Sequence, residues 1–261
     1  MSYIKTSSKD VRVVINADDF GYSLGVNESI KNLVSCGRIT SATIMANGPE
    51  VDDAVAFARE SRSASFGVHL NLTEFAPLTR VSRFEACGVA SGGEFSGNIR
   101  NVGVNRRILN LVYEEWVQQI RLLQQKGLEV SHIDSHHHVH TIPWLLPVLS
   151  RVRKRFGISR VRNTRNLYCG DRVGMGKIFG KNIWSFVVRR VYLFDMATYF
   201  GAAESVLKDP GVLRMCVGGS VELSCHPGHD YAVEEVGALY SDWRERLPFN
   251  VKLITYNDIN R

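Results

Sequence analysis

Residues 131–140 read Ser-His-Ile-Asp-Ser-His-His-His-Val-His and contain five of the eight histidines in this chain of 261 residues. The residues before them, Leu128–Ile133, predict a short strand, and Thr141 and Pro143 open the helix that follows. The histidines therefore follow the carboxyl end of a strand, where α/β folds place their active sites. Neutral imidazole is the commonest metal ligand, and Asp134 is a candidate ligand or the partner that fixes an imidazole ring. The stretch predicts a metal site, and the alternative is a polar loop without metal.

A second group of polar residues follows the first predicted strand. Val11–Ala17 is almost continuously apolar, which is typical of a parallel strand covered on both faces. It ends in Asp18 and Asp19, and two adjacent carboxylates at a buried strand end are costly unless they are paired or bind a metal. A turn with a helix cap is the alternative interpretation, since Asp suits both.

Predicted strands and helices alternate along the chain. The expected strands are 11–17, 40–46, 65–72, 128–133, 159–162, 220–224 and 251–256. The expected helices follow Gly21 to about Cys36 and then cover 51–60, 105–126, 143–156, 178–194 and 231–247. This order predicts a parallel sheet with right-handed crossovers. Four strand ends carry matching chemistry, at Asp18/Asp19, His69, His136 and His226, and their convergence on one mouth favours a deformed (β/α) barrel of about seven parallel strands over an open sheet.

We expect a single domain over residues 1–261, with two insertions. Residues 75–105 form a long, Gly-rich segment, and loops of that length are usually lids or binding loops. Residues 167–217 are predicted to be helical and variable. Within them, residues 178–194 are apolar and aromatic with Arg189 and Arg190, which predicts a packing helix; a dimer face or a membrane-surface face are the alternatives.

The composition is that of an ordinary globular protein, with 44% hydrophobic and 22% charged residues. No run of 18 apolar residues predicts a spanning helix, and residues 1–10 lack the apolar core of a signal peptide. The five cysteines are scattered singly, which argues against disulfides or a structural zinc site and predicts the cytoplasm. The net charge of +6 permits an anionic substrate or a peripheral membrane contact, and no nucleic-acid-binding motif is present.

Four motifs together resemble those of the YdjC-like (ChbG/HpnK) carbohydrate deacetylase family. They are Asn-Ala-Asp-Asp-Phe-Gly at 16–21, Gly-Val-His-Leu-Asn-Leu-Thr at 67–73, Asp-Ser-His-His-His-Val-His at 134–140 and Glu-Leu-Ser-Cys-His-Pro-Gly at 222–228. The resemblance extends from about Val11 to Tyr256, without a family signature in 167–217. It implies a deformed barrel related to those of the polysaccharide deacetylases, one divalent metal ion (Mg²⁺ or Zn²⁺), and removal of N-acetyl groups from chitin-type oligosaccharides.

The resemblance also implies roles for individual residues. Asp19, His69 and His136 would be the metal ligands. The adjacent aspartates resemble the pair of the broader polysaccharide deacetylases, in which the first is the base and the second binds the metal, so Asp18 would be the base. One carboxylate and two imidazoles leave positions open for water and substrate, which suits a hydrolytic metal site. Because a departing amine needs a proton, His226 from another strand end is our candidate acid.

Three further residues are expected to bind substrate: His138, His140 and Arg162. A competing assignment places His140 among the metal ligands together with His136, at the i, i+4 spacing of a helix. The expected partner is an N-acetylated carbohydrate, and a homodimer is a further expectation.

The sequence thus predicts a metal-dependent hydrolase that removes an N-acetyl group from an amino sugar. Another hydrolase, either a phosphoesterase or an amidohydrolase, is the first alternative. Against it, the second metal ion that phosphoesterases often use would require more carboxylates than the sequence shows. A non-catalytic sugar-binding protein is the second, although a binder needs neither Asp18 nor His226. The sequence identifies neither the sugar nor the metal.

Overall fold

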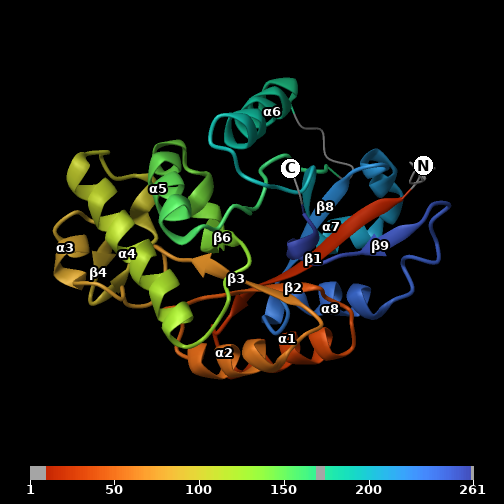
Figure 1. Ribbon diagram of the computed structural model, residues 1–261, viewed down its shortest axis with the longest axis horizontal. Helices are drawn as coiled ribbons and strands as arrows, with labels where there is room; N and C mark the ends of the chain where they lie inside the picture. Colours follow the sequence, from red (N-terminus) through yellow and green to blue (C-terminus); the bar gives the residue numbers. More distant parts are fainter. Residues whose placement is uncertain (1–9, 169–173, 260–261) are drawn as a thin grey trace, which may run out of the picture.

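The computed structural model describes residues 10–168 and 174–259, and its centre is a curled, fully parallel sheet (Figure 1). The sheet has the order β6-β3-β2-β1-β8-β7, and β9 pairs with the first residues of β1. Its strands are β1 (Val11–Phe20), β2 (Ser41–Ile44), β3 (Ser65–Leu70), β6 (Ile133–Ser135), β7 (Tyr199–Ala202), β8 (Ser220–Cys225) and β9 (Val251–Leu253).

Isolated bridges connect the two outer strands of this sheet. Val161 pairs with Ile133 of β6, Arg160 pairs with Asp195, and Asn166 pairs with Phe200 of β7. Residues 160–166 therefore span the opening between β6 and β7 without forming a regular strand. A parallel sheet curled in this way, with helices outside it, confirms the predicted deformed (β/α) barrel.

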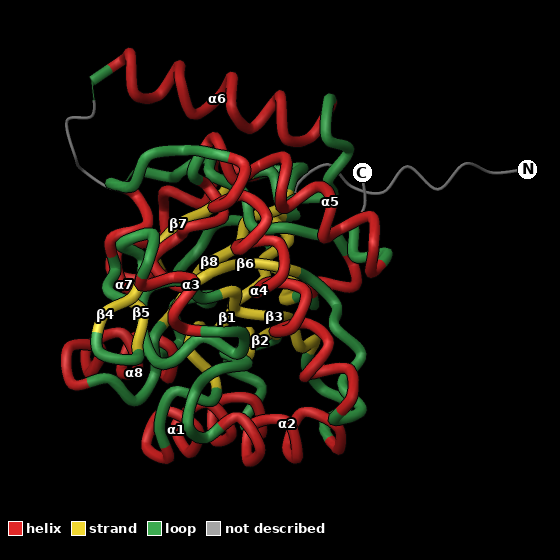
Figure 2. The backbone as a smooth tube through the Cα atoms, turned by 90° about the vertical axis from the view of Figure 1, so that its left-hand side faces the viewer, coloured by secondary structure: helices red, strands yellow, loops and turns green. Residues whose placement is uncertain are grey.

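The helices lie around the sheet and in the connections between its strands (Figure 2). Their bounds are α1 (Leu24–Ser35), α2 (Val51–Glu60), α3 (Val81–Glu85), α4 (Arg106–Gln125), α5 (Leu146–Phe156), α6 (Met175–Arg190), α7 (Ala203–Lys208) and α8 (Val233–Tyr240). None of the described helices is long and apolar enough to cross a membrane.

Four predictions differ from the observed elements. The strand expected at 128–133 is observed as β6 (Ile133–Ser135), so the two share only Ile133. The expected strand at 159–162 makes only single bridges, whereas β7 falls in a region predicted to be helical. A four-residue strand that contains Gly201 is too short to show a clear period of two. The helix expected at 231–247 is shorter, because the chain is extended at Ser241, directly after α8.

The insertion at 75–105 is more regular than expected. It contains α3, a two-stranded hairpin of β4 (Ala90–Ser91) and β5 (Glu94–Phe95), and a short 3₁₀ turn. The second insertion contains α6, which stands apart at the top of Figure 1, as well as β7 and α7. Residues 169–173, with Cys169, lie outside the described residues.

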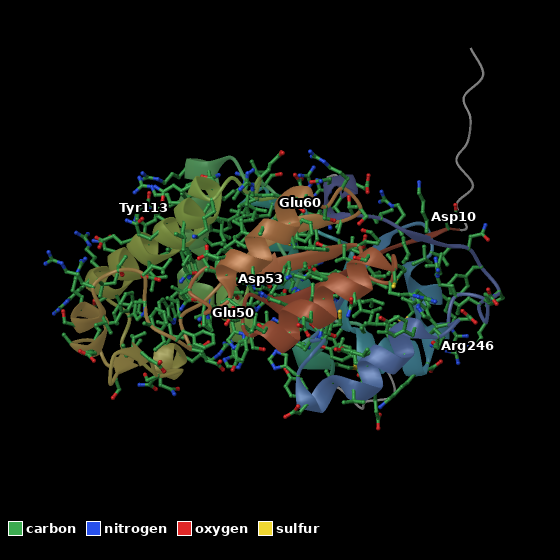
Figure 3. The ribbon with its side chains drawn as sticks, turned by 90° about the horizontal axis from the view of Figure 1, so that it is seen from below. Asp10, Glu50, Asp53, Glu60, Tyr113 and Arg246 are labelled. Carbon is green, nitrogen blue, oxygen red and sulfur yellow. The ribbon has the colours of Figure 1, made fainter. Side chains whose placement is uncertain are left out.

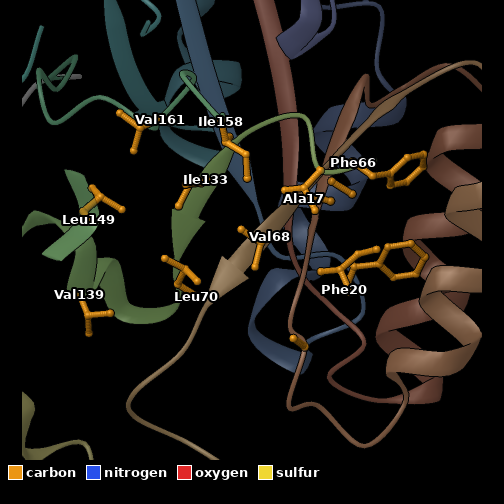
Figure 4. Close-up of a cluster of buried hydrophobic side chains, with 14 of the residues drawn as sticks. Ala17, Phe20, Phe66, Val68, Leu70, Ile133, Val139, Leu149, Ile158 and Val161 are labelled. Atoms are coloured by element: carbon orange, nitrogen blue, oxygen red, sulfur yellow. The ribbon is translucent and has the colours of Figure 1, made fainter. Parts of the chain in front are cut away.

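The face of the sheet that meets the helices is apolar. Alternate residues of β1, among them Ile15 and Ala17, belong to one large cluster of buried hydrophobic side chains. Figure 4 shows Phe20 and Phe66 of this cluster pointing away from the sheet towards the helices. Both rings lie against Phe57 of α2, with centroids 6.1 and 6.4 Å away. This burial is the main stabilising contribution of the outer layer.

The opposite face of the same strands, which lines the barrel, is strongly polar. Its members are all buried: Asn16, Asp18, Ser41, Thr43, Ser65, His69, His132, Asp134, Arg162, Glu222 and Tyr256. At its base the His132 ring stacks on Tyr256 at 3.6 Å, and its Nε2 lies 3.2 Å from Asn16 Oδ1. Gly67 makes room for this imidazole, because a Cβ at that position would lie 2.6 Å from the His132 ring. The apolar appearance of the strands in sequence thus conceals a polar interior.

Helices α1 and α2 lie side by side beneath the sheet, as Figure 3 shows from below with Asp53 labelled on α2. The buried Asn27 of α1 links three segments: its Oδ1 accepts a hydrogen bond of 2.7 Å from Gly21 N, and its Nδ2 donates one of 2.7 Å to Asp53 Oδ2. Lys31 also pairs with Asp53. These contacts anchor the turn that follows the two aspartates at the end of β1.

Candidate metal centre and active site

The end of β1 brings two consecutive carboxylates to the same site. Side chains normally alternate along a strand, so Asp18 and Asp19 would point to opposite faces. However, the pairing of β1 with β2 shifts register between Ala17 and Phe20, and Asp19 has a left-handed φ of +64°. Such a conformation costs free energy in a residue other than glycine and is concentrated at functional sites. The irregular backbone therefore allows both carboxylates to face the site.

Asp19 lies at the centre of a buried group of candidate ligands. Its Oδ1 is 2.8 Å from His136 Nδ1 and 3.1 Å from His69 Nε2. One potential ligand atom from each of these three side chains lies within 4.8 Å of the others. The structure thus brings together the three residues that the sequence proposed as metal ligands, from the ends of β1, β3 and β6.

Asp134 fixes the orientation of one of these rings. His69 Nδ1 lies 2.7 Å from Asp134 Oδ1, and Thr43 donates a hydrogen bond of 3.0 Å to Asp134 Oδ2. A metal-binding histidine usually donates its other ring N–H to such a carboxylate, which sets the tautomer. Of the two roles considered for Asp134, the geometry therefore favours the partner that orients an imidazole.

The chemistry of these donors fits a divalent cation. If the Nδ1–H of His69 donates to Asp134, Nε2 of the neutral ring carries a lone pair. That lone pair points towards the Asp19 carboxylate. Although burial opposes it, the Asp134 and Asp19 carboxylates raise the pKa of His69 to about 10. The site therefore favours positive charge between His69 and Asp19, and a metal ion held by both would supply it. Two imidazoles and one carboxylate form a common ligand set of catalytic metal sites.

Asp18 is held by a buried arginine. Arg162 Nη1 and Nη2 donate hydrogen bonds of 2.6 Å to Oδ2 and Oδ1 of Asp18, and Asn16 Nδ2 donates a third hydrogen bond of 2.9 Å to Oδ1. Burial alone would raise the pKa of Asp18, but the guanidinium lowers it well below its usual range. Asp18 is therefore an oriented carboxylate that stays ionised at neutral pH.

The same arginine connects the active site to the interior of the barrel. Arg162 Nη2 also lies 2.7 Å from Asp134 Oδ2, and its Nε donates a hydrogen bond of 2.7 Å to Glu222 Oε1. The Tyr256 hydroxyl donates to the second oxygen of Glu222. The guanidinium of Arg162, the residue predicted to bind substrate, is thus engaged by three carboxylates.

His226 lies beside Asp18 at the end of β8. Its Nε2 lies 3.7 Å from Asp18 Oδ2, and its backbone N–H donates a hydrogen bond of 2.6 Å to Glu235 Oε2. The following turn depends on Gly228, which has a φ of +88° and packs against α1, where a Cβ would lie 2.6 Å from Val26 Cα. The imidazole is held at the mouth with about a third of its surface exposed.

Sequence reasoning missed two residues of the site. His229 Nε2 lies 3.1 Å from Asp19 Oδ2, and Glu74 Oε1 lies 3.2 Å from His136 Nε2. His229 stands in the same strand-end segment as His226, so its position offered a signal. Glu74 offered none, because a lone glutamate in a loop after β3 is an ordinary surface residue.

The remaining histidines of the 131–140 stretch have different surroundings. His137 and His138 have left-handed φ angles of +48° and +52°, so the chain turns sharply after β6 instead of continuing as an α-helix. The His140 ring is buried, with Nδ1 2.5 Å from Ser135 Oγ. Among the described residues, His140 belongs to no group of converging ligand atoms. The described residues therefore do not bring His136 and His140 together as joint ligands, because the chain lacks the α-helical geometry on which the i, i+4 assignment depends.

Comparison with known proteins identifies the family. The sequence profile described as YdjC-like protein matches residues 12–246. The chain belongs to the YdjC-like family. This confirms the resemblance carried by the four motifs, and the matched region includes the candidate residues from Asp18 to His229.

Curated relatives and a solved structure agree with this membership. A protein of Halalkalibacterium halodurans named carbohydrate deacetylase is 28% identical over 90% of this YdjC-like chain and 91% of its own length. A carbohydrate deacetylase of Vibrio campbellii is 36% identical over 57% of both chains. A crystal structure from Enterococcus faecalis, described as a candidate cellobiose-phosphate cleavage protein, superposes with a TM-score of 0.75 and 24% identity over 95% of this chain and 98% of that one. The last likeness establishes the fold alone.

Proposed function

We propose that this YdjC-like protein is a metal-dependent hydrolase that removes an N-acetyl group from an amino-sugar-containing carbohydrate, with residues 1–261 acting as one domain. The observation that carries the proposal is the convergence of Asp19, His69 and His136 beside Asp18 and His226 at the carboxyl edge of the sheet. The names of the two curated relatives support the same activity.

In this proposal Asp19, His69 and His136 hold one divalent ion, Mg²⁺ or Zn²⁺. When bound, the ion would act as a Lewis acid on the amide carbonyl and acidify water in the site. Asp134 keeps the His69 ring in the orientation that ligation requires. Glu74 and His229 contact His136 and Asp19 and limit their movement.

Asp18 is the base in this proposal. Its carboxylate is anionic at neutral pH and is fixed by both terminal nitrogens of Arg162. It can therefore accept the proton from the attacking water without first reorienting, which is the positional requirement for general base catalysis. The low pKa limits its strength as a base, so its contribution depends on position.

His226 is the proposed acid. An amine is a poor leaving group unless it is protonated, and an imidazole can supply that proton near neutral pH. The ring lies 3.7 Å from Asp18 and is accessible from the mouth, so it can reach a substrate that lies over the site. His229 lies against Asp19 instead, which suits support of a ligand better than proton donation.

A phosphoesterase with two metal ions fits the site less well. Two further groups of potential ligands are found among the described residues: Asp18, His69 and Asp134, and Glu74, His136 and His137. The Arg162 guanidinium pairs with both carboxylates of the former, so their charge is already compensated. The latter offers a single carboxylate and shares His136 with the proposed site. A non-catalytic sugar-binding protein would have no use for the acid and the base positioned beside the ligands.

The activity can be tested by measuring acetate release from a panel of N-acetylated glycans. The protein is first stripped with a chelator and then assayed with and without added Mg²⁺ or Zn²⁺. We expect acetate from at least one amino sugar only when a metal is restored. Metal-dependent release of phosphate from phosphoesters, with no acetate from any glycan, would replace this proposal with the phosphoesterase.

The four described cysteines are free thiols, which supports a reducing compartment and our assignment to the cytoplasm. The outer face of α6 exposes Phe179 and Phe186, at 66% and 63% of their surface. A homodimer contact and a peripheral membrane contact both stay predictions for this face.

A further inference from the structure

A cavity of about 240 Å³ lies between α6 and the candidate active site. Trp184 and Lys181 of α6 form one side of it, and Phe200 of β7 contributes another wall. His138 and Arg162 also line it. The insertion 167–217, for which the sequence offered no family signature, therefore encloses space directly beside the site.

One lining residue connects the cavity to Asp18, the proposed base. Arg162, at its edge, is the residue whose guanidinium holds Asp18. His138 packs against Phe200 on the same side, with ring centroids 5.6 Å apart. A molecule in the cavity would consequently contact the arginine that holds Asp18, the base of the proposed reaction.

The lining combines aromatic faces with amide and hydroxyl groups and with two cationic side chains, Lys181 and Arg162. The charge of Arg162 is compensated by three carboxylates. Trp184 and Phe200 supply the apolar surface. Asn166 Oδ1 accepts a hydrogen bond of 2.8 Å from Lys181 Nζ. Among the residues that the structure describes, the buried Thr164 Oγ1 finds no hydrogen-bond partner, which is costly unless a ligand or water supplies one. No Asp or Glu occurs among the described residues that line the cavity.

We propose that this cavity binds one pyranose ring of the substrate, with Trp184 stacked against the apolar face of the ring. This rests on the proposed deacetylase function and assigns its substrate-binding site. Sugar rings present C–H groups on one face and hydroxyls at the edge, and they match an aromatic wall bordered by amide and hydroxyl groups. The volume is below the range of about 300–1,000 Å³ typical of drug-sized ligands, so it suits a single ring.

The test compares two aromatic residues of the same helix. Trp184→Ala removes the cavity wall, whereas Phe186→Ala changes a ring on the exposed outer face of α6. Binding of di-N-acetylchitobiose is measured by calorimetry, and acetate release from it gives KM and kcat. For Trp184→Ala we expect Kd and KM to rise about tenfold, with kcat within about twofold and bound metal unchanged.

Matched variants distinguish stacking from folding. Phe186→Ala should behave as the wild type, and Trp184→Phe should restore most of the affinity because it keeps an aromatic face. Sugar binding should also change the tryptophan fluorescence of the wild type more than that of Trp184→Phe, since the proposed ring lies on Trp184. A loss of kcat and metal in Trp184→Ala without a change in Kd would overturn the assignment and indicate a structural role.

The outcomes separate this inference from the proposed function. If the wild type releases acetate and Trp184→Ala has the wild-type KM, the cavity assignment is wrong and the deacetylase function stands. If the wild type binds the sugar without releasing acetate, and Trp184→Ala loses that binding, the cavity assignment stands and the function is wrong. If the wild type neither binds any glycan of the panel nor releases acetate from one, both the cavity assignment and the deacetylase function are wrong.

Discussion

The two faces of the parallel sheet are built from the same strands but stabilise the protein in opposite ways. The outer face packs Ile15, Ala17 and Phe20 against helices, and its contribution comes from burying apolar surface. The inner face buries a network that runs from Tyr256 through Glu222 to Arg162. Removing charges from water is expensive, and buried ion pairs often contribute little net stability. The inner face is therefore better explained by the positions it imposes than by the stability it adds.

Those positions are the ones that the chemistry requires. Arg162 fixes Asp18, the proposed base, and also pairs with Asp134, which orients the proposed ligand His69. One guanidinium thereby sets the relative placement of the base and of a metal ligand from different strands. The comparison predicts that changes on the inner face will affect activity and stability together, and changes on the outer face stability alone.

The largest effect is expected for Arg162→Met. The change leaves the carboxylates of Asp18, Asp134 and Glu222 buried without their cation, and breaking such a network costs about 3–5 kcal/mol. Urea denaturation would measure the loss of unfolding free energy, and acetate release should fall below detection. A variant that keeps full activity would contradict the positional role of the inner network.

The next largest effect is expected for His226→Ala, with His229→Ala as the matched variant. His226→Ala should retain its metal and lose a factor of about 10² to 10⁴ in rate on an N-acetyl sugar, with a much smaller loss on an ester whose leaving group needs no proton. His229→Ala should instead weaken metal binding about 10- to 100-fold, because His229 contacts Asp19. Equal losses on amide and ester, or loss of metal in His226→Ala, would remove His226 from the role of acid.

The pH dependence of stability sharpens the first prediction. In the wild type the pKa of Asp18 is depressed, so its stabilising contribution is complete above the unfolded value of 3.8 and is lost only as the pH falls through the lower folded value. In Arg162→Met, burial should raise the pKa of Asp18 instead, and ionisation then destabilises the fold at neutral pH. The stability gap between the two proteins should narrow from pH 7 to pH 5 in urea titrations with chelator present. A constant gap would show that Arg162 does not control this carboxylate.

The smallest effect is expected on the outer face. Ile15→Val removes one methylene from a fully buried side chain and should cost about 0.5–1.5 kcal/mol. The rate per folded molecule and the metal content should be unchanged, because this residue contacts the helices and not the site. A rate loss larger than the fraction unfolded would indicate that the two faces are coupled.

Much of the fold could be predicted because the strand ends are marked by their chemistry. Helix α2 was expected at its observed bounds, and β1, β2, β3 and β8 were located within a few residues. The segment at 159–162 and β7 could not be read correctly, since single bridges and a four-residue strand leave no periodic signal.

The candidate ligands of the site could be predicted from the sequence, but the ion pairs that hold the site together could not. The grouping of Asp19, His69 and His136 followed from their places at converging strand ends. The engagement of Arg162 by three carboxylates depends on side chains distant in sequence, and no local pattern encodes it. The polar interior of the barrel was also not predicted. A strand of small and β-branched residues has an apolar sequence pattern even where these residues alternate with Asn16 and Asp18.

The central claim is that two adjacent aspartates perform different tasks, one holding metal and the other accepting a proton. The most direct test is metal content, measured by mass spectrometry, together with acetate release in Asp18→Asn and Asp19→Ala. We predict that Asp19→Ala loses metal and activity together, whereas Asp18→Asn keeps its metal and loses a factor of about 10² to 10⁴ in rate. Loss of metal in Asp18→Asn with retention in Asp19→Ala would reverse the roles and contradict the account.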